Sequence, residues 1–143
     1  MKHILIVVSE DRYFVSHRLH LAEAALLQGY KVSLLSKISD QKDLIESKGV
    51  EILNWSLTRS SYNPIKELVS VWQIFSVLKK IKPDLVHAVA LKPILYTSIS
   101  SKFSGLASRV FSIAGLGFIF SSEKLLARIL RPLIVLSFQL ALT

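Results

Sequence analysis

Cysteine is absent from the 143-residue sequence. This absence excludes a disulfide framework, a thiolate metal site and a cysteine nucleophile, and it is compatible with a reducing compartment. Long apolar runs are absent too. The run at 4–8 is followed at once by charged residues, too soon for a signal-peptide core, and the run at 132–142 falls well below the roughly 20 residues of a spanning helix. We therefore expect a cytoplasmic chain that spans no membrane.

Several familiar cofactor and metal motifs are missing. There is no GxxxxGK[ST] phosphate loop, and Gly115 and Gly117 follow the last predicted strand without the third glycine of a dinucleotide fingerprint. The four histidines show no HExxH spacing, although His17 and His20 could share one helix face. A phosphorylated receiver domain is excluded because no aspartate ends the third predicted strand. We expect neither a cofactor nor a metal in this chain.

Apolar residues, by contrast, are plentiful. The chain is 51% hydrophobic and 20% charged, with a mean hydropathy of +0.46, which is the composition of a folded chain and not of a disordered one. Its length fits one domain, 1–143. Eighteen Lys and Arg against ten Asp and Glu give a net charge of +8. Such a balance favours polyanions, anionic membrane surfaces or phosphorylated ligands, and a solvated basic face also explains it.

Hydrophobic periodicity alternates between strand and helix along the chain. The predicted strands are 3–8, 31–36, 50–55, 85–89 and 109–114. The predicted helices are 15–28, 40–47, 64–82, 93–103 and a last one from about 123. Continuous apolar strands alternating with helices predict a doubly wound, Rossmann-like α/β fold with a parallel sheet of about five strands.

The helix after Asn63 has the clearest local signals. Asn63 is a predicted N-cap and Pro64 suits the first helical position. Apolar residues follow at helical spacing, and we predict that the stripe they form packs in the core: Ile65, Leu68, Trp72, Phe75 and Leu78.

Candidate binding residues follow the predicted strands. In open α/β sheets, ligands bind at the carboxyl ends of the strands, so Arg18, Arg59 and Lys92 are predicted to converge there beside the glycine turn at 115–117. Cations and backbone N–H groups suit an anionic, phosphorylated ligand. Each residue also has a purely structural explanation. Asn63 is the simplest case, because it is a helix cap, and His87 inside a strand is expected to be buried and hydrogen-bonded.

Five segments together carry a family resemblance. They are YFVSHRL at 13–19, RSSYNP at 59–64, KPDLVH at 82–87, KP at 92–93 and GLGFIF at 115–120. In this order and spacing they resemble the N-terminal half of family 4 glycosyltransferases of the GT-B fold, in the branch that acts in lipid-linked and capsular polysaccharide assembly.

The resemblance implies retaining transfer of a sugar from a UDP-sugar to a polyprenyl-diphosphate-linked saccharide at the inner face of the cytoplasmic membrane. It also implies that this half binds the acceptor, while a C-terminal half binds the UDP-sugar donor. The acceptor-binding residues that it implies are His17, Arg18, Arg59, Ser60, Asn63, Lys92, Gly115 and Gly117. No catalytic residue is implied, because the histidine that many relatives carry after the fifth strand is missing from Ile113-Ala114-Gly115.

Relatives of this kind continue beyond the position of Thr143. We therefore expect a truncated or split form that lacks the last strand of its sheet and is inactive alone. The alternative is a non-catalytic subunit on an anionic membrane surface that recruits a separate donor-binding chain. The final helix could rest on that membrane or pack on the sheet. Nucleic acid is not an expected partner, because the basic residues are not interleaved with exposed aromatics on a recognisable module.

Overall fold

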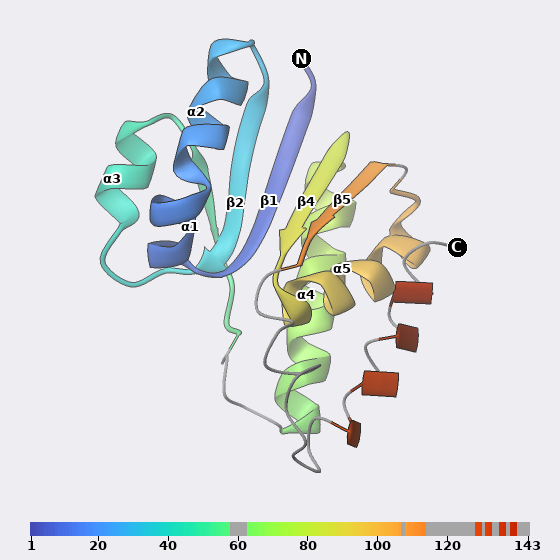
Figure 1. Ribbon diagram of the computed structural model, residues 1–143. Helices are drawn as coiled ribbons and strands as arrows, with labels where there is room; N and C mark the ends of the chain where they lie inside the picture. The colour runs from blue at the N-terminus through green and yellow to red at the C-terminus, as the bar shows by residue number, and fades with distance from the viewer. Residues whose placement is uncertain are drawn as a thin grey trace.

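The computed structural model describes residues 1–57, 63–106 and 108–113, together with 128–129, 131–132, 135–136 and 138–139. The strands are β1 (His3–Glu10), β2 (Lys31–Lys37), β3 (Glu51–Asn54), β4 (Leu85–Val89) and β5 (Ser108–Ser112). The helices are α1 (Asp11–His17), α2 (Leu19–Leu27), α3 (Lys42–Ser47), α4 (Pro64–Ile81) and α5 (Leu91–Ser104) (Figure 1).

The strands form one parallel sheet in the order β3-β2-β1-β4-β5. The chain winds outward from β1 to β3, crosses back through α4, and then winds outward in the other direction through β4 and β5. This is the doubly wound arrangement, so the predicted fold class is confirmed. Because the winding direction reverses between β1 and β4, a crevice is expected above the carboxyl ends of these two strands.

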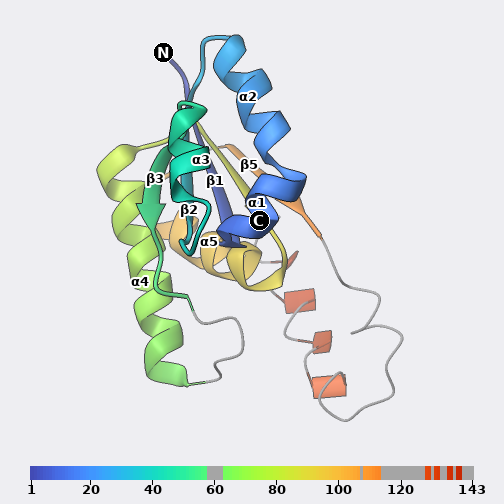
Figure 2. The ribbon, with the colours of Figure 1, turned by 90° about the vertical axis from the view of Figure 1, so that its left-hand side faces the viewer.

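Helices cover both faces of the sheet, and a hydrophobic core lies under each layer (Figure 2). Phe14, Leu19 and Ile45 bring α1, α2 and α3 onto one face. Helices α4 and α5 cover the other, where Ile74 and Ile94 pack over the central strands. The continuous apolar sequence of β1 follows from this arrangement, since alternate residues enter different cores.

The buried face of α4 differs from the predicted one. Asn63 is the N-cap, as predicted, with its Oδ1 accepting from the Ile65 N–H at 3.0 Å. Leu78 of the predicted stripe is buried, but the prediction is wrong for Ile65, Leu68 and Trp72, which are 72%, 69% and 66% exposed. Instead, α4 buries the stripe of Ser70, Ile74 and Leu78. The helix carries apolar residues on both sides, and periodicity alone did not indicate which side faces the sheet.

Helix α5, the other helix of this layer, explains why α4 buries the stripe of Ser70, Ile74 and Leu78. Helix α5 buries four small hydroxyl side chains: Thr97, Ser98, Ser100 and Ser101. Ser100 Oγ donates to the Val71 carbonyl of α4 at 3.1 Å. Small residues let two helix backbones approach closely, so α4 turns its 70/74/78 side towards α5 and the sheet.

Two boundaries near β1 also differ from prediction. Residues 10–14 were predicted as a loop, but α1 begins at Asp11, directly after β1. The single helix predicted over 15–28 is two helices, because Arg18 leaves the helical region at φ −131°. The break changes the direction of the chain at a residue that carries a predicted binding side chain.

The described residues between 128 and 139 are helical, as predicted for the last element. Phe138 packs against the core beneath α4 and α5, whereas Ile129, Val135 and Leu136 are exposed. The predicted start of this helix near 123 lies outside the described residues.

A polar network crosses three strands near the amino edge of the sheet. His3 Nε2 lies 2.7 Å from Ser33 Oγ, which donates to Glu51 Oε2 at 2.6 Å, and Lys31 forms an ion pair with the same carboxylate at 3.0 Å. Burial lowers the pKa of His3, as does the charge of Lys31, despite opposing effects of Glu51 and Asp84. Burial and Lys31 therefore favour the neutral form of His3 at neutral pH.

This network predicts a loss of stability in mild acid. The folded pKa of His3 lies below its ordinary value of 6.5, so the folded state resists protonation more than the unfolded state. The free energy of unfolding should be constant above pH 6.5 and fall as the pH drops through the folded pKa. In denaturant titrations between pH 7.5 and 5, the free energy of unfolding of His3→Gln should fall less steeply with decreasing pH than that of the wild-type chain. His20→Gln, a change at an exposed histidine, should keep the wild-type slope; equal slopes for all three proteins would contradict the argument.

Candidate functional site at the carboxyl edge

The site begins at Asp11, the first residue after β1. Its carboxylate is fully buried and accepts hydrogen bonds from Ser39 N–H and Oγ at 2.7 Å, from Gln41 N–H at 3.1 Å and from Arg12 N–H at 2.9 Å. Burial alone would raise the pKa of Asp11, but these hydrogen bonds, led by those from Ser39, lower it. The carboxylate therefore ties the turn after β2 to the start of α1.

Arg12 lies outside this buried contact. Its guanidinium forms a bidentate pair with Asp40, with Nε 3.0 Å from Oδ1 and Nη2 2.7 Å from Oδ2. The hydrogen bond from Arg12 holds the pKa of Asp40 well below its usual range. Both side chains are largely exposed, so solvent screens the pair and it adds little to stability.

Three side chains stack along α1 and at its C-cap. The rings of Tyr13 and His17 are parallel, with centroids 4.4 Å apart, as the i, i+4 spacing of a helix allows. The Arg18 guanidinium carbon lies 5.9 Å from the centroid of the Tyr13 ring, within cation–π range. Arg18 Nη1 also donates to the His17 carbonyl at 2.9 Å. The aromatic pair thus supports the arginine at the break between α1 and α2.

Arg18 also influences His87 of β4. Burial lowers the pKa of His87, and the positive charge of Arg18 lowers it further. His87 Nε2 lies 3.5 Å from Ser112 Oγ of β5, a long contact. His87 is buried, as predicted from its place in a strand. We call Tyr13, His17, Arg18, His87 and Ser112 the Arg18 cluster.

One donor of the Arg18 cluster is unsatisfied. Arg18 Nε is buried and has no hydrogen-bond partner among the described residues. An unpaired buried donor costs about 1–3 kcal/mol, and more when the group is charged. Buried polar groups are normally paired, so an unpaired one calls for an acceptor such as a ligand oxygen. Together with His17 and Ser112, the guanidinium gives this part of the edge donors for an anion.

Lys92 lies elsewhere. It was predicted in a loop, but it belongs to the first turn of α5, where its Nζ pairs with Glu67 of α4 at 3.0 Å. Arg18 lies in the α1–α2 layer and Lys92 in the α4–α5 layer, on opposite faces of the sheet. The structure therefore does not bring these two cations into one cluster. Asn63 serves as the cap of α4.

Four other predicted site residues belong to two further segments of the chain, 59–60 and 115–117. Arg59, Ser60, Gly115 and Gly117 lie outside the described residues. The predicted glycine turn and the arginine loop therefore remain predictions.

Three residues of this edge were missed as site components. Asp11 was assigned to a loop, Tyr13 was given no role, and His87 was assigned only to the core. The i, i+4 spacing of Tyr13 and His17 was the one available signal, and it required the helix to begin at Asp11. The approach of His87 to Arg18 depends on the pairing of β1 with β4, which joins residues about 80 positions apart.

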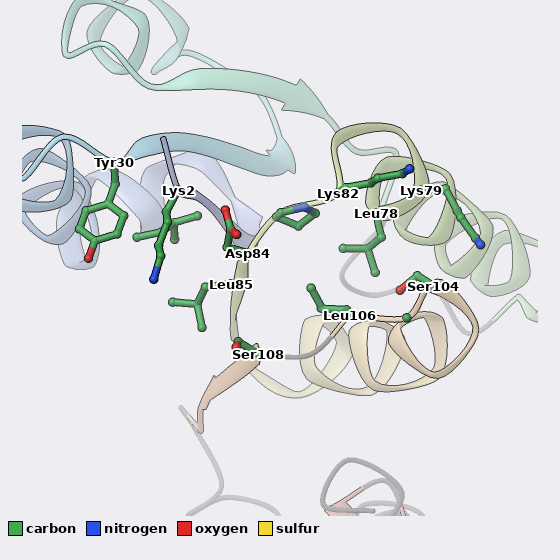
Figure 3. A pocket seen from close by; sticks show the side chains of 13 residues that line it. Lys2, Tyr30, Leu78, Lys79, Lys82, Asp84, Leu85, Ser104, Leu106 and Ser108 are labelled. Atoms are coloured by element: carbon green, nitrogen blue, oxygen red, sulfur yellow. The ribbon is translucent and has the colours of Figure 1, made fainter.

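A hollow lies at the opposite, amino edge of the sheet. It has a volume of about 880 Å³ and is bordered by the ends of α4 and α5 and by the starts of the strands (Figure 3). Lys2, Lys79, Lys82 and Asp84 line it together with Tyr30. Helix carboxyl ends repel anions and attract lysines, which accounts for Lys79 and Lys82 without a ligand. We therefore place the candidate site at the carboxyl edge and not at this hollow.

Two features are absent from the described residues, a metal-binding cluster and a membrane-spanning helix. No group of three or more His, Asp or Glu side chains in that part of the chain could hold a metal ion. None of the helices described is long and apolar enough to cross a membrane.

Comparison with known proteins gives one family and a set of similar folds. Residues 3–142 match the model of the family described as "Glycosyl transferase 4-like". No curated protein sequence matches the chain. Among solved structures, MurG of Acinetobacter baumannii is 18% identical with a TM-score of 0.63, over 79% of this chain and 34% of MurG.

Two more glycosyltransferase structures are similar. One, from Rickettsia africae, is 16% identical with a TM-score of 0.63, over 87% of this chain and 34% of that one. The calicheamicin glycosyltransferase CalG4 is 12% identical with a TM-score of 0.61, over 96% of this chain and 43% of that one. The chain thus spans about a third to two fifths of the length of these proteins, and at such identities the likeness concerns the fold.

Proposed function

Because the chain belongs to the glycosyl transferase 4-like family, we propose that it is the acceptor-binding half of a retaining glycosyltransferase acting on a polyprenyl-diphosphate-linked saccharide. The observation that carries the proposal is the unpaired Nε–H of Arg18 at the carboxyl edge, where β1 and β4 lie side by side. A diphosphate offers oxygen acceptors of the right charge, and hydrogen bonds between ions are about twice as strong as neutral ones.

The Arg18 cluster suggests how the acceptor is held. Tyr13 and His17 support the guanidinium from the side of α1, so less conformational freedom is lost when a phosphate binds. The lowered pKa of His87 keeps its imidazole neutral at pH 7, where it and Ser112 present hydrogen-bonding groups beside Arg18. Such a site binds and orients the diphosphate and leaves bond cleavage to groups elsewhere.

The donor is proposed to bind outside this chain. A UDP-sugar carries its own diphosphate, which must be held opposite the acceptor before transfer can occur. We propose that a separate donor-binding domain or chain supplies this site, at the cytoplasmic face of an anionic membrane. The purified chain should then bind acceptor yet not transfer sugar when a UDP-sugar is added.

Replacing Arg18 tests the proposal. Arg18→Gln should weaken binding of a short-chain prenyl-diphosphate saccharide at least about tenfold, the loss of one charged hydrogen bond. Isothermal titration calorimetry on the full chain would measure this change. The matched control is Arg12→Gln, which removes an exposed arginine of the same α1 that is already paired with Asp40.

Three results would contradict the proposal. The first is equal affinity of the wild-type and Arg18→Gln chains. The second is equal affinity for the saccharide with and without its diphosphate. The third is robust sugar transfer by the purified chain alone, which would mean that the donor site is also present.

A further inference from the structure

A largely buried ion pair lies at the carboxyl edge, in the layer formed by α4 and α5. Glu67 of the first turn of α4 pairs with Lys92 of the first turn of α5, and each side chain is only 22% exposed. The other ion pairs between described residues keep at least 38% of each side chain exposed. Because the first half of α4 extends past the carboxyl ends of the strands, the pair lies on the side of the sheet where open α/β folds bind their ligands (Figures 1 and 2).

One of the two carboxylate oxygens of Glu67 lacks a partner among the described residues. Oε1 accepts from Lys92 Nζ at 3.0 Å, whereas Oε2 is buried and has no hydrogen bond. Buried polar atoms in folded proteins are normally paired, so Oε2 calls for a donor that this part of the chain does not supply. An ionised carboxylate can only accept, which means that the missing partner carries an O–H or N–H group.

The turn that leads to Lys92 is strained. A single residue, Ala90, joins β4 to α5, and its backbone angles are φ 73° and ψ 168°, a region essentially restricted to glycine. The Ala90 N–H donates to the Ser112 carbonyl of β5 at 3.1 Å, which helps to hold this conformation. Strain of this kind clusters at ligand-binding sites, and here it starts α5 directly after β4. Lys92, and with it Glu67, is therefore fixed next to the end of the strand that carries His87.

The ligand group that fits Glu67 differs from the one that fits Arg18. A carboxylate repels a phosphate, but it is a strong acceptor for a hydroxyl group. The acceptor proposed above has both chemical parts, a diphosphate and a saccharide rich in hydroxyls. The Arg18 cluster and the Glu67–Lys92 pair belong to opposite layers, on either side of the end of β4. A single ligand laid across this strand end would meet both.

We propose that Glu67, held in place by Lys92, accepts a hydrogen bond from a hydroxyl group of the acceptor saccharide and thereby helps to select the sugar. The proposal deepens the proposed function and rests on it, since it assumes the same acceptor. Lys92 was predicted to contact the acceptor itself. In this proposal it is a positioning residue, and Glu67 makes the contact.

Ligands with and without a sugar separate the two sites. The panel consists of a short-chain prenyl diphosphate and its glucosyl, galactosyl, N-acetylglucosaminyl and N-acetylgalactosaminyl derivatives, titrated calorimetrically into the full chain. The wild-type chain should bind at least one glycosylated ligand more tightly than the sugar-free diphosphate. Glu67→Gln should bind that ligand about tenfold more weakly, the loss of one hydrogen bond to a charged group, and should bind the sugar-free diphosphate as the wild type does. Arg18→Gln, by contrast, should weaken both ligands.

Control variants make the test specific. Glu23→Gln removes another carboxylate that is paired with a lysine, Lys48, and should change neither affinity. Lys92→Gln should lower the affinity for the glycosylated ligand only, and Lys92→Arg should restore most of it, since a guanidinium also holds a carboxylate. Among deoxy analogues of the preferred ligand, one should bind the wild type about tenfold more weakly and should bind Glu67→Gln no more weakly than the parent ligand does.

An equal loss of affinity for both ligands in Glu67→Gln would overturn the proposal, because it would indicate a structural role. So would a wild-type chain that no sugar helps to bind, or deoxy analogues that weaken the wild type and Glu67→Gln alike. If no ligand of the panel binds, the proposed function fails as well. If Arg18→Gln weakens binding while Glu67→Gln matches the wild type, only the role of Glu67 is rejected.

Discussion

Replacing Trp55 by alanine is expected to lower the free energy of unfolding by about 4 kcal/mol, in the range observed for large core aromatics. The Trp55 side chain is fully buried, and its Nε1–H donates to the Ser70 carbonyl of α4 at 3.3 Å. Its ring meets Tyr96 of α5 edge-on, with centroids 6.3 Å apart. Its removal would leave a cavity between the sheet and both helices of one layer, and the Ser70 carbonyl would lose one of its donors.

Trp72→Ala is the matched control for this change. Trp72 is mostly exposed, so its loss should alter the free energy of unfolding by no more than about 0.5 kcal/mol. Equilibrium unfolding in urea, followed by circular dichroism, measures both variants on one scale. Similar losses for the two tryptophans would mean that the outer face of α4 is covered in the folded chain.

Asp11→Ala is the second change with a large expected effect, a loss of about 3 kcal/mol. It leaves the Ser39 and Gln41 N–H groups without the acceptor on which the turn after β2 depends. Asp40→Ala removes an exposed carboxylate near the same turn and should cost little. Chemical unfolding at pH 7 measures both.

The pH dependence of stability provides a second test of the role of the Asp11 carboxylate. The folded pKa of Asp11 lies below its ordinary value near 3.8, so its contribution is complete above that pH and declines as the pH falls through the folded value. The difference between wild type and Asp11→Ala should therefore shrink towards pH 2. A constant difference across this range would show that the carboxylate charge is not what stabilises the turn.

The sequence carried enough information for the fold because its strands are continuous and apolar. The central strands β1, β2 and β4 are covered on both faces, so a run such as 4–8 is recognisable without alternation. Helix α4 shows that the sequence pattern did not determine which face of a helix is buried. Leu68 and Ile74 are equally apolar, and which of them is buried depends on the small serines of α5, a partner from a later segment of the chain.

The candidate site was harder to predict than the fold. Arg18 was identified as a binding residue from its motif, but its neighbours depend on details that periodicity does not resolve. Helix α1 starts at Asp11 because the buried carboxylate needs donors from the turn at 38–41, a contact across about 30 residues. His87 approaches Arg18 through a pairing of distant strands. Contacts of these two kinds assemble the site, and neither leaves a local sequence signal.

The strand order has a consequence for how the chain folds during synthesis. Strands β1, β2 and β3 and helices α1, α2 and α3 are all contained in the first 54 residues, and their contacts are local along the chain. Strand β4, by contrast, must reach β1 across about 80 residues, closing the longest loop of the sheet. One layer can therefore form on the nascent chain while the other waits for α4 and α5. Until they emerge, Trp55 and the underside of three strands remain uncovered, which makes this interval the one in which the chain most needs protection from aggregation.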